Sequence, residues 1–426
     1  MKGTRSALTV ASVLAFLSFA CVDATGPAGP GNQANGRITI VNDPATLGSQ
    51  VTYFNDSIPV DASGVGYPSA PARSPGMSAS LVSPAAGSGS VNLRLKTEVA
   101  SPIVGGQTLQ ATSVSMVGSL AVVSYNMIGN PYLGAVDVIS INPGGQPTLT
   151  SRAVFQNTDV SAVFASGTNV YLAEATGDTG FQAPAVAELL QLVGNNLVLT
   201  GNRRTGLTSF AATSATASGT RAYATTGNTG GLYVLDPVAL TVLNSFSLHD
   251  ARWVAVSGGK VVVVQGTPGQ ITVYDETTLA PVGTFPFKGA DIAESKSTVE
   301  LAGGKAFIAA GDSGVQVLSA STGLVVGSVP RPDPASLGLS PSVVVTNSAS
   351  MDADLLFISN GEAGVYVAQG SQAFSATGSE TQQTITMLGK LRFANLQSAN
   401  HVAYSADKKY LIIAAGLGGL KIVQVN

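Results

Sequence analysis

The sequence predicts an all-β protein, a seven-bladed β-propeller of four-stranded antiparallel blades. A unit of strand, turn and strand recurs seven times, its copies start roughly 40 to 55 residues apart, and no helical periodicity separates them. In the clearest copy, Gly219–Asp236, two short strands flank the Gly-rich turn Gly227–Gly231. A two-sheet sandwich is the alternative for many short strands, but seven similar units favour the propeller.

The first strands of the units share a short apolar run that ends in small or polar residues. They are Leu120–Tyr125, Asn169–Ala175, Arg221–Thr225, Lys260–Gly266, Lys305–Gly311, Leu355–Gly361 and Lys409–Gly416. The partner strands read AVDVISI, AVAELLQL, GLYVLD, QITVYD, GVQVLS, GVYVAQ and GLKIVQV. Glycines in the later turns, such as Gly311 and Gly314, allow tight antiparallel pairs because glycine adopts positive φ at little cost.

Further short apolar segments complete the blades. Third strands are expected at Thr241–Leu248, Pro281–Phe287 and Leu324–Val329, and strands that open the next unit at Arg252–Val256, Ser342–Thr346 and His401–Ser405. Two units depart from the pattern, with a long turn within Asn169–Leu192 and an insertion within Gly370–Lys390. Each repeat therefore supplies four strands, the number in a propeller blade.

The last repeat lacks a fourth strand, because the sequence ends at Asn426 after the seventh pair. Val91–Val99 (VNLRLKTEV) alternates apolar and polar residues, which is typical of a half-buried strand. We expect this segment to join the seventh blade and close the ring, since closure removes an exposed sheet edge.

The units GLYVLD, GVYVAQ and GLKIVQV resemble the LVIVD-type or YVTN-type β-propeller repeats of exported bacterial proteins. The resemblance covers roughly residues 91–426. It implies the propeller fold and an exported bacterial lipoprotein, but these repeats are structural and imply no activity.

The N-terminus has the features of an export signal. Lys2 and Arg5 precede a short apolar run, Ala7–Ala20, which ends directly before Cys21, the single cysteine. The arrangement resembles a lipobox, whose cysteine is acylated, although Ser18 and Phe19 depart from its usual residues. Ordinary signal cleavage is the alternative. We expect residues 1–20 to be a signal peptide and Cys21 to anchor the protein in a membrane of the cell envelope.

Between this signal and the propeller the sequence predicts little independent structure. Residues 21–36 are rich in Gly, Pro, Asn and Ala and are expected to form a flexible tether. Residues 37–90 read as a loop-rich accessory segment, with candidate strands at Arg37–Val41 and Gln50–Phe54. Residues 91–426 form the propeller domain.

Composition agrees with a rigid all-β protein and gives no reason to expect a nucleic-acid partner. Apolar residues make up 45% of the sequence and charged residues only 11%, too apolar for a disordered chain. The net charge of −3 and the lack of Lys and Arg runs give no reason to expect nucleic-acid binding.

The turns within the strand pairs and the links between repeats should share one face around the propeller axis. Two long turns, Tyr125–Gly134 and Ala175–Ala185, carry Tyr132 and Phe181, which are candidate binding anchors or a lid that packs on itself. The links should add charged residues: Arg203, Arg204, His249, Asp250, Arg252, Lys288, Asp291, Arg331 and Asp333. Solvated loop residues or ion pairs are the alternative for these. Trp253 is expected in the core between blades.

No catalytic motif is present. With only His249 and His401, no spacing supports a zinc site, and we expect no metal and no cofactor. The predicted function is therefore a lipid-anchored binding or scaffold module of the cell envelope, with an unknown envelope protein or extracellular ligand as partner. A propeller-type lactonase or hydrolase, with its site at the channel mouth, is the alternative.

Overall fold

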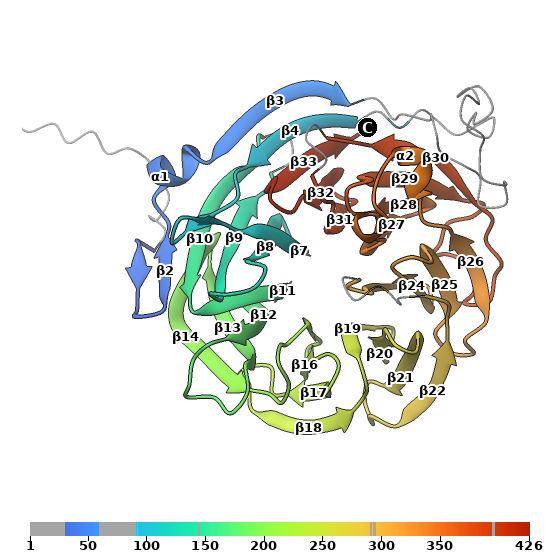
Figure 1. Ribbon diagram of the computed structural model, residues 1–426, viewed down its shortest axis with the longest axis horizontal. Helices are drawn as coiled ribbons and strands as arrows, with labels where there is room; N and C mark the ends of the chain where they lie inside the picture. Colours follow the sequence, from blue (N-terminus) through green and yellow to red (C-terminus); the bar gives the residue numbers. More distant parts are fainter. Residues whose placement is uncertain are drawn as a thin grey trace, which may run out of the picture.

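The computed structural model describes residues 30–58, 91, 93–142, 145–289, 292, 295–393 and 397–426. It confirms the predicted fold class: seven antiparallel sheets surround a common axis as the blades of a propeller (Figure 1). The signal segment 1–20, Cys21, most of the tether and residues 59–90 lie outside the described residues.

In blades 1 to 6, the four blade strands follow chain order from the axis outward. Blade 1 comprises β7 (Gln110–Val117), β8 (Leu120–Asn126), β9 (Leu133–Ser140) and β10 (Thr148–Gln156). Blade 2 comprises β11 (Thr158–Ser166), β12 (Asn169–Thr176), β13 (Ala185–Val193) and β14 (Asn196–Gly206). Blade 3 comprises β15 (Ser214–Ala217), β16 (Ala222–Thr225), β17 (Gly231–Leu235) and β18 (Val242–Ser247).

Blades 4 to 6 continue the same order around the ring. Blade 4 comprises β19 (Ala251–Ser257), β20 (Lys260–Gln265), β21 (Gln270–Asp275) and β22 (Pro281–Pro286). Blade 5 comprises β23 (Val299–Ala302), β24 (Lys305–Ala309), β25 (Val315–Ser319) and β26 (Val325–Val329). Blade 6 comprises β27 (Ser348–Asp352), β28 (Leu355–Ser359), β29 (Val365–Gly370) and β30 (Ile385–Leu391).

Strand alternation explains why the second strands are largely apolar. In β20, Val261 and Val263 pack with Tyr223 and other residues of blade 3, whereas Val262 and Val264 pack toward blade 5. Successive side chains of a strand point to opposite faces, and each blade has a neighbour on both faces. A run of β-branched residues therefore buries every side chain, which is the reason that these segments were recognisable in the sequence.

The structure confirms that the N-terminal strand closes the ring. In blade 7, β31 (His401–Ser405), β32 (Tyr410–Ala414) and β33 (Leu420–Val425) are followed outward by β4 (Leu93–Val99), and Leu420 pairs with Val99. Figure 1 shows β4 lying along β33.

The turn glycines show that β4 takes the place of an ordinary fourth strand. Gly314 and Gly419 have φ values of 74° and 71° in the turns of blades 5 and 7. A Cβ on Gly314 would lie 2.0 Å from the carbonyl oxygen of Val329 at the end of β26, and one on Gly419 would lie 2.2 Å from that of Val99. The same close approach of turn and outer strand recurs in both blades, and only glycine permits it.

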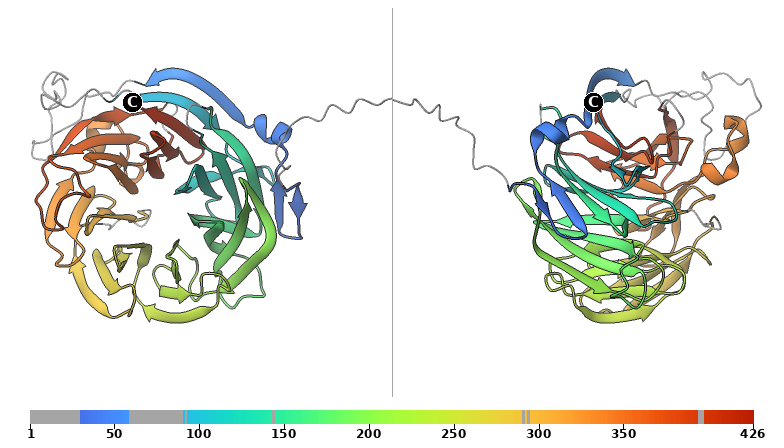
Figure 2. Two further views of the ribbon diagram at one scale, coloured as in Figure 1. Left: turned by 180° about the vertical axis from the view of Figure 1, so that it is seen from behind. Right: turned by 60° about the vertical axis from the view of Figure 1, so that its left-hand side comes forward.

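The accessory segment forms a staple over the closure. Its described elements are β2 (Ile38–Val41), α1 (Pro44–Gly48) and β3 (Val51–Ile58). β1 (Gln33–Ala34) pairs with β2 and lies within the expected flexible tether 21–36, so the described end of that tether forms a strand instead. β2 pairs with β10 of blade 1 and β3 pairs with β4 of blade 7, so the two expected strands extend different blades (Figure 2). Leu47 of α1 is buried in the core that blades 1 and 7 share. Packing of the segment therefore supports the closure on its outer side.

One expected strand is wrong. Ser342–Thr346 is not a strand: a 3₁₀ turn, η2 (Pro341–Val343), precedes an isolated bridge from Thr346 to Gly311, and the inner strand of blade 6 is β27. The β27 sequence SASMD alternates polar and apolar residues, but only Ala349 and Met351 are apolar, so its strand signal is weak. The hydroxyl of Ser348 accepts a hydrogen bond from the backbone N–H of Val402 at 2.8 Å, so this strand contacts blade 7 partly through polar side chains.

Short elements fill the remaining links. β5 (Ile103–Val104) and β6 (Gln107–Thr108) form a hairpin before blade 1, and α2 (Pro334–Leu337) lies between blades 5 and 6. The expected insertion is the loop 371–384 between β29 and β30, and its Phe374 is fully buried against Phe307 of blade 5 with ring centroids 5.1 Å apart. No helix in the described part of the chain is long and apolar enough to span a membrane.

Candidate functional site

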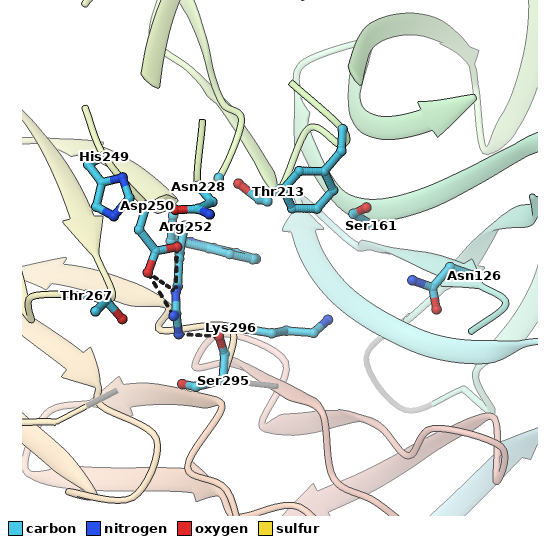
Figure 3. A pocket seen from close by; sticks show the side chains of 13 residues that line it. Asn126, Ser161, Thr213, Asn228, His249, Asp250, Arg252, Thr267, Ser295 and Lys296 are labelled. Carbon is cyan, nitrogen blue, oxygen red and sulfur yellow. Dashed lines mark hydrogen bonds and ion pairs between the residues drawn. The ribbon is translucent and has the colours of Figure 1, made fainter. Parts of the chain in front are cut away.

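Turns and links from blades 1 to 5 enclose a pocket of about 560 Å³ at one mouth of the propeller channel (Figure 3). It includes Asn126 at the end of β8, Asn228 in the β16–β17 turn and the link residues before β19 and β23. A pocket of this volume is within the range that small-molecule sites occupy.

Asp250 and Arg252 form an ion pair on one wall of the pocket. Nη2 of Arg252 lies 2.8 Å from Oδ2 of Asp250, and Nη1 donates to the carbonyl oxygen of Ser295 at 3.0 Å. Gly266 makes room for this guanidinium, since a Cβ there would lie 2.0 Å from Nε of Arg252. The pair thus fixes the β22–β23 link, and its two charges neutralise each other.

Aromatic residues provide the apolar surface of the site. Trp253 lines both the mouth pocket and the channel below it, and its ring stacks on His401 of β31 with centroids 5.6 Å apart. Phe210 in the β14–β15 link is 59% exposed at the pocket rim. Trp253 also packs on the apolar clusters of the adjacent blades, so its predicted place in the core is only part of its role.

Lys296 reaches across the floor of the pocket. Its side chain starts in the link before blade 5, and its Nζ donates a hydrogen bond to the backbone carbonyl of Thr112 in blade 1. Figure 3 shows it extending from beside Ser295 toward Ser161 and Asn126. Lys296 is half-buried, and the part of its side chain that stays accessible faces the interior of the propeller. Desolvation there lowers the pKa of Lys296 from 10.5 to about 7.

Below Lys296 the channel encloses about 390 Å³ and contains further titratable groups. Burial, and then the charge of Lys296, lower the pKa of His401 to about 3, which leaves the imidazole neutral near pH 7. Burial raises the pKa of Glu300 to about 7, opposed by hydrogen bonds from Ser350 and the backbone of Met351. The channel thus disfavours charge.

The structure brings three of the predicted face residues together. His249 and Asp250 in the link before β19, and Arg252 near the start of β19, all line the mouth pocket. Whether this face binds a partner stays a prediction.

The other predicted face residues lie elsewhere. Arg203 and Arg204 are within β14, the outermost strand of blade 2, rather than in a link. Arg204 pairs with Asp178 at 2.8 Å, and its guanidinium lies 4.7 Å from the ring centroid of Phe181. Phe181 therefore packs on the outer strand, and Tyr132 is half-buried in its turn without lining the pocket.

The remaining link residues have separate surroundings. Lys288 lies beside a second cavity, of about 530 Å³, and Asp291 is outside the described residues. Arg331 donates to the carbonyl oxygens of Pro341 and Val344, and Asp333 caps the N-terminus of α2. These two serve the local fold of the link.

Sequence reasoning missed Lys296, Asn228, Ser161 and Phe210. The signal that could have found Lys296 is its position directly before an inner strand, because every such link approaches the axis. Among the described residues, no group of three or more His, Cys, Asp and Glu side chains could hold a metal ion.

Comparison with known proteins gives information about the fold and about no other property. No protein-family model matches the chain, and no curated protein sequence matches it. A solved structure of similar fold is a chain of the "Crystal Structure of Mitotic Checkpoint Complex", with a TM-score of 0.52 and 12% sequence identity over 74% of this chain and 86% of that chain. At this identity the likeness shows a shared architecture and nothing about activity.

Proposed function

We propose that this chain is an exported binding module of the cell envelope, which takes its ligand or partner at the mouth pocket and is held to a membrane through Cys21. The observation that carries the binding role is a large open pocket on a rigid scaffold, lined by strand, turn and link residues of blades 1 to 4 and of the link to blade 5. A propeller of similar fold occurs in a checkpoint complex, and by analogy this architecture suits a binding scaffold.

Unsatisfied polar groups support the same role. The side chains of Asn126, Ser161, Asn228 and His249 line the pocket, and none has a hydrogen-bond partner among the described residues. Arg252 and Thr213, in contrast, are engaged by Asp250 and Thr225. Polar groups without a protein partner are available to orient a ligand, whereas engaged ones maintain the fold.

Filling the pocket should abolish binding. Asn228 is exposed in the β16–β17 turn, so Asn228→Trp should leave the blades intact while its indole occupies the mouth. The matched control is Ser321→Trp in the β25–β26 turn, exposed on the opposite face. Native purification followed by mass spectrometry should find a ligand or partner with wild type and Ser321→Trp but not with Asn228→Trp. Equal retention by all three proteins would exclude the mouth as the site.

Anchoring is tested separately. The sequence places Cys21 directly after a short apolar run with two N-terminal cations, which supports acylation at this residue. Each buried methylene of an acyl chain stabilises membrane binding by about 0.8 kcal/mol, so two or more chains give stable attachment. Cys21→Ser should lose metabolic labelling with palmitate and move to the soluble fraction. Unchanged fractionation and labelling would contradict acylation at Cys21.

A further inference from the structure

Lys296 is a cation in the mouth pocket without a countercharge. It forms no ion pair with any carboxylate among the described residues, and its Nζ makes one hydrogen bond, to the carbonyl oxygen of Thr112. The other cationic side chain of the pocket, Arg252, is neutralised by Asp250. A protonated Lys296 therefore gives the floor of the pocket an uncompensated positive charge, which costs free energy in a partly desolvated place.

Hydrogen-bond donors surround the same space. Asn126 and Ser161 line the pocket on the side toward which Lys296 extends (Figure 3). Neither side chain has a partner among the described residues. An ammonium with neighbouring amide and hydroxyl donors is suited to a carboxylate, because such oxygens accept several charge-assisted hydrogen bonds.

The rest of the pocket is suited to an apolar body. Trp253 and Phe210 line it, and its volume of about 560 Å³ exceeds what a bare inorganic anion would fill. Burying an aromatic or aliphatic group on these rings would favour binding, because it removes apolar surface from water. The pocket thus combines one anion-binding end with an apolar wall.

We propose that the mouth pocket binds a small monocarboxylate with an aromatic or aliphatic body, with the carboxylate on Nζ of Lys296 and the body against Trp253 and Phe210. This assignment rests on the proposed binding function and names its ligand class. Binding supplies the countercharge that Lys296 lacks.

The affinity should depend on pH, because only the protonated lysine attracts a carboxylate. The pKa of free Lys296 is about 7, so the competent fraction is high below pH 7 and falls tenfold per pH unit above it. The other titratable or charged groups that face this space are His401 from blade 7, His249, the Asp250–Arg252 pair and, deeper in the channel, Glu300. Since the pKa of His401 is about 3, this ring stays neutral throughout the relevant range.

The single tryptophan of the chain provides the measurement. Trp253 lines the pocket, so its fluorescence in the full-length protein should report a titration with phenylacetate. We expect saturable binding at least about tenfold tighter than that of neutral phenylacetamide, weakening about 30-fold between pH 6 and pH 8.5. Equal affinity for the acid and the amide, no weakening with pH, or no saturable response to phenylacetate, benzoate or hexanoate would overturn the proposal.

Two variants separate Lys296 from the other groups. Lys296→Met should lose the preference for the acid over the amide. Lys296→Arg stays charged at all these pH values, so it should keep the preference and lose the pH dependence. A pH dependence retained in Lys296→Arg would assign it to a group other than Lys296 and contradict the role of this lysine. If either variant fails to fold, the wild-type protein alone tests the proposal, through its affinities for the acid and the amide and their dependence on pH.

Failure here is distinguishable from failure of the proposed function. Loss of a native ligand from Asn228→Trp, together with no response to any carboxylate, would retain the mouth as a binding site and reject the ligand class.

Discussion

Deletion of β4, Leu93–Val99, should unfold the whole propeller rather than loosen one blade. Leu93 and Val99 are fully buried, and β4 pairs with β33 on one side and β3 on the other. Losing the burial of these two side chains and of half-buried Leu95 costs on the order of 5 kcal/mol, before the lost backbone hydrogen bonds are counted. That is a large part of the roughly 5–15 kcal/mol by which domains are stable.

Truncated chains separate the contribution of β4 to stability from that of the accessory segment. Residues 91–426 should melt cooperatively, and residues 100–426 should not. Moving 91–99 behind Asn426 should restore the transition, because Val425 at the end of β33 pairs with Leu93 at the start of β4. Thermal unfolding followed by circular dichroism measures all three chains. An unchanged melting temperature for 100–426 would contradict closure by β4.

Arg152→Met should be among the most destabilising single substitutions. Asp137 is fully buried, and its two carboxylate oxygens accept hydrogen bonds from Nε and Nη2 of Arg152, both at 2.7 Å. Arg152 also donates to the carbonyl oxygen of Ala100, directly after β4. Removing the guanidinium leaves a buried carboxylate without its cation, which typically costs about 3–5 kcal/mol of the free energy of unfolding.

Urea denaturation with matched controls tests this pair. Arg203→Met, at an exposed position of β14, should change the free energy of unfolding little. The double variant Asp137→Leu with Arg152→Met should be more stable than the single one, since no charge is then buried. Equal costs for Arg152→Met and Arg203→Met would refute the account.

The blades were predictable because their signals are local. The second strands, such as Lys260–Gln265, bury both faces and are therefore largely apolar, and the turns need glycine at positive φ, as at Gly314. Ser342–Thr346 misled the prediction because an apolar run also suits a packed link: Val344 is fully buried there without forming a strand. The Ser-rich β27 gave only a weak signal, because Ala349 and Met351 are its two apolar residues.

The candidate site was only partly predictable, because it depends on where separate links meet. His249 and Asp250 lie in the link between β18 and β19, and Arg252 is the second residue of β19, so their place beside the axis follows from the strand pattern. Lys296 contacts Thr112, which is 184 residues away in the sequence. A contact between residues so far apart cannot be predicted from a local sequence pattern. Phe181 was assigned to the face because its loop is long, yet it packs over Arg204 on the outer strand.

In-cell photo-crosslinking at the channel mouth tests the central claim most directly. A photoreactive phenylalanine analogue would replace Asn228 in one protein and Ser321, on the opposite face, in another. We expect a discrete adduct, a partner protein or a small-molecule mass shift, from position 228 and none from position 321. An adduct from position 321 alone, or none from either position in folded protein, would contradict binding at the mouth.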